Sequence, residues 1–175
     1  GGAGTSGSRC GTLHPEWWGA NSAGGDTTAI KDANALAFNR MFSAAPNSTA
    51  DGVTPAPGRG AVIELAPGIY RTSTVINGVS YVTVQGHGWR NSGIIADETT
   101  LGSNAVIQCT NCRWSNWRDF FIETAGPHSN VNQHCMRFLR TNTFGNKISI
   151  RDMAFAYCFD SINIDGDSTN ITISS

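Results

Sequence analysis

Acidic side chains in the second half of the chain are its best candidates for chemistry. Two carboxyl groups can cleave a glycosidic bond when they lie about 5 Å apart for retention of configuration, or further apart for inversion. The candidates are Glu123, Asp152, Asp160, Asp165 and Asp167. No two of them occur at a spacing that is diagnostic of such a pair. The preferred catalytic candidates are Asp160, Asp165 and Asp167, because they lie on the last expected coils.

The tryptophans have different expected roles. Trp114 can stack on a sugar ring and is the candidate substrate-binding residue. Trp117 aligns with Ile150 in a strand repeat, so we expect its side chain to point inward. Trp17 and Trp18, in the sequence PEWWGA, are expected to pack beneath a helix.

The cysteines suggest no metal centre. The five residues are Cys10, Cys109, Cys112, Cys135 and Cys158. An odd number leaves at least one cysteine free or paired between chains. The pair Cys109 and Cys112 invites a zinc or redox interpretation, with His134 and Cys135 as further ligands. Adjacent residues on a strand point to opposite faces, however, and cannot easily bind one tetrahedral ion. We expect the cysteines to fill the core as small apolar side chains, with no metal and no cofactor.

Composition excludes several classes of protein. The chain has 175 residues, which suits a single domain, and its formal net charge is -1. Lysine and arginine are scattered singly, which argues against a nucleic-acid partner. No run of apolar residues is long enough for a membrane-spanning helix. Twenty glycines and only 14% charged residues are typical of a turn-rich β protein.

Strand-like runs repeat along the chain from Gly60 onward. The first series is VSYVTVQGHG (79–88), RWSNWRDFFIE (113–123), NKISIRDMAFA (146–156) and TNITISS (169–175). These runs align on the four residues Val84, Trp117, Ile150 and Ile173, which are spaced by 33, 33 and 23 positions. A second series falls between them, as NAVIQC (104–109), HCMRFLR (134–140) and DSINIDG (160–166). Two interleaved series at such a period predict a solenoid of β coils.

Alternation within the strands predicts which side chains are buried. Alternate residues of a strand face the interior, so the four aligned residues should form one interior ladder. The pairs Val82 and Val84, Ile148 and Ile150, and Ile171 and Ile173 share this pattern. Asp119 and Asp152 follow the first-series strands at equivalent positions, where we expect them to form turns.

An amphipathic helix is expected before the first coil. Asp26 and Thr27 are good capping residues, and apolar residues then recur at three or four positions over 27–43. The first coil of a solenoid would otherwise expose its apolar end to water, so this helix can serve as a cap. The expected organisation is a linker and lead-in segment at 1–25, a capping helix at 26–45, and coils over 46–175.

The N-terminal motifs resemble those of a known superfamily. The succession PEWWGA, GGDTTAI, GAVIELAPGIYRTS and VSYVTVQGHGWRNSGII over residues 14–97 is similar to the start of pectate-lyase-like, right-handed parallel β-helix proteins. The sequence looks most like the form of this superfamily found in bacteriophage tailspikes and capsule depolymerases. The resemblance implies an all-β solenoid with an N-terminal capping helix, of which this chain is the N-terminal portion.

The resemblance also implies a function. It suggests a tailspike or tail-fibre protein of the virion tail that binds and cleaves host capsule or lipopolysaccharide, as a homotrimer with other tail proteins as partners. The alternatives are an inert structural or receptor-binding rod, and a secreted bacterial lyase, epimerase or fructotransferase.

The last strand, in DGDSTNITISS, is followed by no capping element. We therefore expect further coils, and most of the catalytic carboxylates, to lie beyond residue 175.

Overall fold

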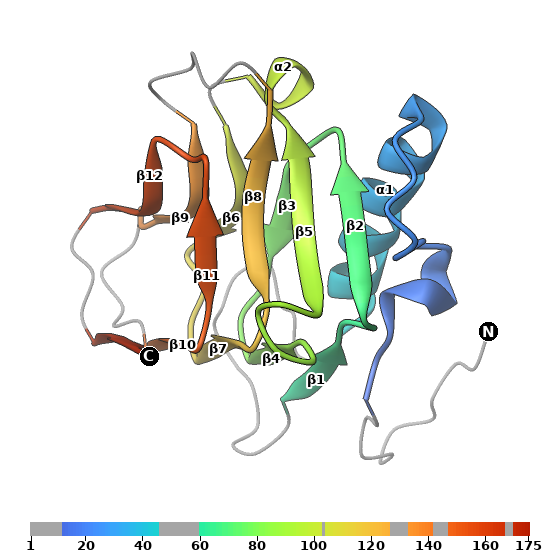
Figure 1. Ribbon diagram of the computed structural model, residues 1–175. Helices are drawn as coiled ribbons and strands as arrows, with labels where there is room; N and C mark the ends of the chain where they lie inside the picture. Colours follow the sequence, from blue (N-terminus) through green and yellow to red (C-terminus); the bar gives the residue numbers. More distant parts are fainter. Residues whose placement is uncertain (1–11, 46–59, 103, 127–132, 142–146, 167–169) are drawn as a thin grey trace.

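Three parallel sheets form the faces of a solenoid, and the N-terminal helix lies at one end of it (Figure 1). The computed structural model describes residues 12–45, 60–102, 104–126, 133–141, 147–166 and 170–175. Sheet A contains β1 (Ala61–Glu64), β4 (Val82–Gln85), β7 (Ser115–Arg118), β10 (Ile148–Arg151) and β13 (Ile171–Ser174). Sheet B contains β2 (Gly68–Thr72), β5 (Ser92–Asp97), β8 (Phe121–Ala125) and β11 (Ala154–Ala156). Sheet C contains β3 (Ile76–Gly78), β6 (Ala105–Thr110), β9 (His134–Leu139) and β12 (Asp160–Asp165).

Each coil passes through sheets A, B and C in turn, and every strand pairs in parallel with the equivalent strands of adjacent coils. The predicted solenoid is therefore confirmed. The two strand series found in the sequence correspond to sheets A and C.

Sheet B was not anticipated from the sequence, which gave two strand series instead of three. Two of the bends between sheets A and B are very short, since β7 ends at Arg118 and β8 begins at Phe121, while β10 ends at Arg151 and β11 begins at Ala154. Asp119 and Asp152 make these bends in the left-handed conformation, with φ of 63° and 50°. Both aspartates are thus turn residues, as predicted. The strands on either side of each bend are so close in sequence that they read as one run.

The interior ladder has the predicted register. Ile63 pairs with Val84, Val84 with Trp117, Trp117 with Ile150, and Ile150 with Ile173. Val84, Trp117 and Ile150 are all buried, so the large indole does fit inside the coil. Ile173 has the right register but is 58% exposed, because it lies on the last strand of the sheet.

Ser115 provides the hydrogen-bond acceptor for the N–H group of the buried Trp117 indole. Ser115 lies two residues before Trp117 on the same strand and is buried. Its Oγ accepts a hydrogen bond from Trp117 Nε1 at 3.2 Å. Since a buried indole N–H without a partner is costly, this serine allows tryptophan at the ladder position.

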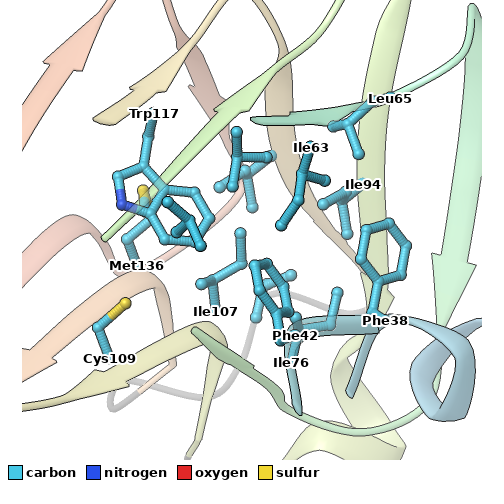
Figure 2. Close-up of a cluster of buried hydrophobic side chains, with 14 of the residues drawn as sticks. Phe38, Phe42, Ile63, Leu65, Ile76, Ile94, Ile107, Cys109, Trp117 and Met136 are labelled. Atoms are coloured by element: carbon cyan, nitrogen blue, oxygen red, sulfur yellow. The ribbon is translucent and has the colours of Figure 1, made fainter. Parts of the chain in front are cut away.

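The predicted capping helix is α1 (Thr28–Ala44). Thr27 is its N-cap and accepts a hydrogen bond from the Ile30 amide. Phe38, Met41 and Phe42 are buried against the first coil, where they close the apolar interior. Figure 2 shows Phe38 and Phe42 within this cluster of buried side chains.

The lead-in segment completes the cap by pairing with the first strands. Leu13 forms a parallel bridge with Ile63 of β1, and Ala23 forms one with Ile69 of β2. Buried Asn34 of α1 holds this segment in place, because its amide donates to the Asn21 and Arg71 carbonyls at 3.1 and 2.9 Å. The exposed edges of the first coil are thus satisfied by backbone and side-chain hydrogen bonds.

The expected packing of the two N-terminal tryptophans is wrong for one of them. They lie in the 3-10 turn η1 (Pro15–Trp18), which directs consecutive side chains differently. Trp18 packs against the core, whereas Trp17 is 67% exposed and lies beside the His14 ring at 4.8 Å between centroids.

The expectation that the cysteines act only as core fillers is also wrong for two of them. Cys135 and Cys158 form a disulfide that joins consecutive coils at the corner between sheets B and C. Cys109 and Cys112 are buried free thiols, as expected of core fillers, and burial raises the pKa of Cys109. Cys10 lies outside the described residues.

Candidate functional site

Sheet C presents a row of polar side chains on its outer face. The residues Ile107 and Cys109 of β6, and Met136 and Phe138 of β9, point into the core. The residues between them therefore point outward. In register across the four strands, this outward row is Asn77, Gln108, Arg137 and Asn163.

One preferred catalytic candidate is part of this face. Asp165 follows Asn163 by two positions and so shares its outward orientation. Arg137 donates to Asp165 Oδ2 from Nε at 2.9 Å and from Nη2 at 2.5 Å. Both side chains are partly exposed, at 30% for Arg137 and 46% for Asp165. A fixed guanidinium beside a carboxylate can bind hydroxyl groups and stabilise negative charge.

The second candidate begins the same strand. Asp160 pairs with His134 of β9, and the His134 Nδ1 atom lies 3.2 Å from Asp160 Oδ2. The two atoms are in contact, but the angles are not those of a hydrogen bond. His134 is buried, while the Asp160 side chain is 44% exposed. A histidine next to a carboxylate is a common arrangement for proton transfer.

The remaining acidic candidates do not join these two. Glu123 lies in β8 of sheet B, and Asp152 forms a bend after β10. Asp167 lies outside the described residues. Asp160 and Asp165 therefore occur on one strand, and each faces a basic side chain instead of a second carboxylate.

Trp114 lies on a different face from the acids. It precedes β7 of sheet A, has a left-handed φ of 53°, and is 53% exposed. The Lys147 ammonium lies 5.3 Å from the centroid of its ring. The sequence correctly separated Trp114 from the buried Trp117, but the structure does not bring Trp114 together with Asp160 or Asp165.

The outward row of sheet C was not predicted from the sequence. Gln108 and Arg137 alternate with buried apolar residues in NAVIQC and HCMRFLR. That alternation was a usable signal, because residues at the same phase of equivalent strands must stack.

A pocket of about 240 Å³ lies where α1 meets the ends of the sheet B strands. Lys31 lies there, 2.9 Å from Asp26 Oδ1 and 2.9 Å from Asp97 Oδ2. Its hydrogen bonds hold the pKa of both aspartates below the ordinary value, and the aspartates raise the pKa of Lys31. We assign this cluster to attachment of the helix, because Lys31 belongs to α1 and Asp97 to β5.

Neither a metal centre nor a membrane helix is found within the described residues. No three side chains of His, Cys, Asp or Glu come together as metal ligands in that part of the chain. None of its helices is long and apolar enough to cross a membrane.

The stacked sheets and the capping helix define the chain as a right-handed parallel β-helix. No protein-family model matches the sequence, and no curated protein matches it. Solved structures do match. The A-module of mannuronan C-5 epimerase AlgE4 from Azotobacter vinelandii aligns with a TM-score of 0.63 and 13% identity, over 93% of this chain and 44% of that one.

Two further solved structures share the fold. The catalytic unit of a GH87 α-1,3-glucanase from Streptomyces thermodiastaticus aligns with a TM-score of 0.57 and 20% identity, over 95% of this chain and 30% of that one. ORF18 of Geobacillus virus E2 aligns with a TM-score of 0.50 and 12% identity, over 93% of this chain and 41% of that one. The chain thus spans less than half the length of each of these proteins.

Proposed function

We propose that the chain belongs to an extracellular phage tail protein that binds and cleaves host surface polysaccharide. The outer face of sheet C is the observation that carries the proposal. It combines amide, guanidinium and carboxylate groups in one row, and such groups recognise the hydroxyls of a glycan.

Two observations of a different kind support the proposal. Among proteins of this fold, one matched structure is an epimerase of mannuronan and another is an α-1,3-glucanase, while a third comes from a virus. The disulfide between Cys135 and Cys158 suits an oxidising environment outside the cell.

Within this function, we assign different roles to the two pairs on sheet C. Asp160, whose side chain is 44% exposed at the start of β12, is the candidate for proton transfer, and the buried His134 imidazole lies beside it. Arg137 and Asp165 are assigned to binding, since the guanidinium holds the carboxylate fixed. Further carboxylates that complete a cleavage site belong to additional coils in this proposal.

Binding is tested with the protein and purified capsule or lipopolysaccharide of the host, by affinity electrophoresis. Asp165→Asn and Arg137→Gln should weaken binding about tenfold, because each removes one partner of a charged pair at the face. Arg40→Gln is the matched control for Arg137→Gln, since it removes the same charge from an exposed position on α1. Equal binding by all three variants would remove sheet C as the glycan site.

Cleavage is tested separately on the same polysaccharide. New reducing ends indicate hydrolysis, whereas ultraviolet absorbance of an unsaturated product indicates a lyase. Binding without shortening favours the alternative of an inert, receptor-binding rod. Turnover of a bacterial polysaccharide without any binding to host surface glycans favours the secreted bacterial enzyme.

Assembly is part of the proposal as well. Tail proteins of the resembled class associate as parallel trimers, so we propose a homotrimer with other tail proteins as partners. Light scattering of the intact protein should give three times the mass of one chain, and a monomer mass would contradict the trimer.

A further inference from the structure

The outer face of sheet A carries a strip of side chains that the proposed function does not use. On β7 and the residue before it, the outward side chains are Trp114, Asn116 and Arg118; on β10 and the residue before it, they are Lys147, Ser149 and Arg151. Asn116 pairs in register with Ser149, and Arg118 pairs with Arg151. Lys147 is adjacent to the start of β7, because its carbonyl accepts from the Ser115 amide at 3.2 Å. We call these six residues the basic strip.

The basic strip is accessible to a ligand. Trp114, Asn116, Lys147 and Arg151 are exposed, and the Arg118 side chain is 38% exposed. The ladder residues between them face the core, so the outward side chains rest on a rigid sheet. Trp114 precedes Arg118 by four residues, which is about 13 Å along a strand. That length accommodates a short stretch of a linear ligand running along β7 and β10.

The charges of the basic strip favour an anionic ligand. Arg118 and Arg151 lie directly opposite each other on adjacent strands, an arrangement that costs free energy for like charges. Arg118 is partly compensated, since it donates to Gln85 Oε1 at 2.7 Å and lies 3.8 Å from Asp119. Arg151 forms no ion pair or hydrogen bond through its side chain with any described residue. A bound carboxylate, sulfate or phosphate between the two guanidinium groups would relieve the repulsion.

The other end of the basic strip suits a ring. The indole of Trp114 is exposed, and Lys147 lies beside it at 5.3 Å from the ring centroid. Pyranose rings stack on such indoles through their C–H groups, and the ammonium can pair with an acidic substituent. Asn116 and Ser149 lie between the two ends and can hydrogen-bond to hydroxyl groups.

We propose that the basic strip binds an acidic polysaccharide, with one sugar ring on Trp114 and the acidic group of another between Arg118 and Arg151. This site is on sheet A and is separate from the outer face of sheet C. The inference rests on the proposed function in one respect, which is that the ligand is a glycan. A single-stranded nucleic acid is disfavoured, because the strip offers three cations and one aromatic ring on a chain of net charge -1.

The experiment measures binding by isothermal titration calorimetry with the 175-residue chain. The probes are an oligogalacturonate, a sulfated dextran oligosaccharide, a neutral dextran oligosaccharide and a single-stranded oligonucleotide. We expect binding of the acidic glycans, weakening as salt is raised, and no binding of the neutral one. The carboxylate and sulfate probes distinguish which acidic group is preferred. Tighter binding of the oligonucleotide than of either acidic glycan, or equal binding of the neutral glycan, would overturn the proposal.

Variants locate the site. Arg151→Gln should weaken oligogalacturonate binding about tenfold, and Trp114→Ala should weaken it roughly fivefold. Arg40→Gln is the matched control, because it removes the same charge from an exposed position on α1. Circular dichroism checks that each variant is folded. If all three variants bind like the parent protein, the strip is not the site.

The two proposed glycan sites can be tested independently. If Arg137→Gln loses glycan binding and Arg151→Gln does not, the sheet C proposal is supported and the basic strip is overturned. The reverse result would support the strip and remove the sheet C site.

Discussion

The indole of Trp117 lies directly against the backbone of Gly78. A Cβ atom at Gly78 would lie 3.2 Å from Cζ2 and Cη2 of the indole, and 2.3 Å from Cys109 Sγ. Gly78 pairs in register with Cys109 on sheet C, while Trp117 comes from sheet A. A tryptophan therefore fits inside a narrow coil because the opposite sheet has no side chain at this point.

Gly78→Ala should destabilise the protein by about 1–3 kcal/mol, since the added methyl group overfills a closely packed core. Chemical denaturation measures the change. Cys109→Ala in the same chain removes the closest atom, so the double variant should recover part of the loss. No difference between the single and double variants would show that the clash is relieved elsewhere.

Trp117→Ala should cost about 3–5 kcal/mol, because the side chain is fully buried in the ladder. Trp114→Ala is the matched control on the same part of the chain. Its side chain is half exposed, so its loss should change stability by less than about 0.5 kcal/mol. Similar losses for the two variants would contradict the assigned orientations.

The ladder was predictable from sequence because the first strand series repeats at nearly constant spacing. Val84, Trp117 and Ile150 keep the same phase, and alternate positions on a strand have fixed faces. The capping helix was predictable for a similar reason, since Thr27 and the apolar periodicity mark its start and its buried side. These features depend on local patterns and on one regular repeat.

Features that depend on how the strands of different sheets and coils are aligned with one another were not predictable from the repeat. The bends at Asp119 and Asp152 occupy so few residues that sheet B merged with sheet A in the sequence. Cys135 and Cys158 are 23 positions apart, and only the corner between sheets B and C brings them together. The ion pair of Arg137 with Asp165 likewise depends on the register between β9 and β12.

The disulfide should contribute measurably to stability. It closes a loop between residues 23 positions apart, which corresponds to about 3 kcal/mol in the chain-entropy account. Reduction with dithiothreitol should therefore lower the Tm of the parent protein. The double variant Cys135→Ala and Cys158→Ala should melt at the lower temperature with or without the reductant. A fall in its Tm on reduction would point to a different disulfide.

The attachment of the capping helix should depend on Lys31. Lys31→Met removes the pair with Asp97, and we expect a loss of about 1 kcal/mol in the free energy of unfolding. Arg40→Met is the control, because Arg40 is exposed on the same helix and the described residues give it no ion pair. Equal effects of the two variants would contradict a role for Lys31 in attachment.

The same cluster has a defined pH dependence. Hydrogen bonds from Lys31 and Thr99 hold the pKa of Asp97 below its ordinary value of 3.8. The contribution of Asp97 to the free energy of unfolding is therefore complete above pH 3.8. It is lost as the pH falls through the lower pKa that Asp97 has in the folded protein. The pKa of Lys31 is raised above 10.5 by hydrogen bonds to Asp26 and Asp97, so its contribution is lost only as the pH rises through the higher value. The stability difference between Lys31→Met and the parent should shrink at both extremes, and a constant difference would contradict this linkage.

The two outer strands of sheet A should differ in hydrogen exchange. The edge of β1 is covered, because the Leu13 amide donates to the Val62 carbonyl at 2.7 Å and the Glu64 amide donates to the Leu13 carbonyl at 2.9 Å. The outer edge of β13 has no such cover among the described residues, and Ile173 is 58% exposed.

In the 175-residue chain, amides of β13 should therefore exchange at least about 100-fold faster than those of β1, even though both strands end the same sheet. Strand β4 provides the internal reference, since it lies between β1 and β7 and buries Val82 and Val84. Exchange followed by mass spectrometry at several protein concentrations measures all three strands. Protection of β13 equal to that of β1 at every concentration would contradict the open edge. Protection that grows with concentration would instead show that a second copy covers it, since an unpaired, apolar strand edge recruits other strands.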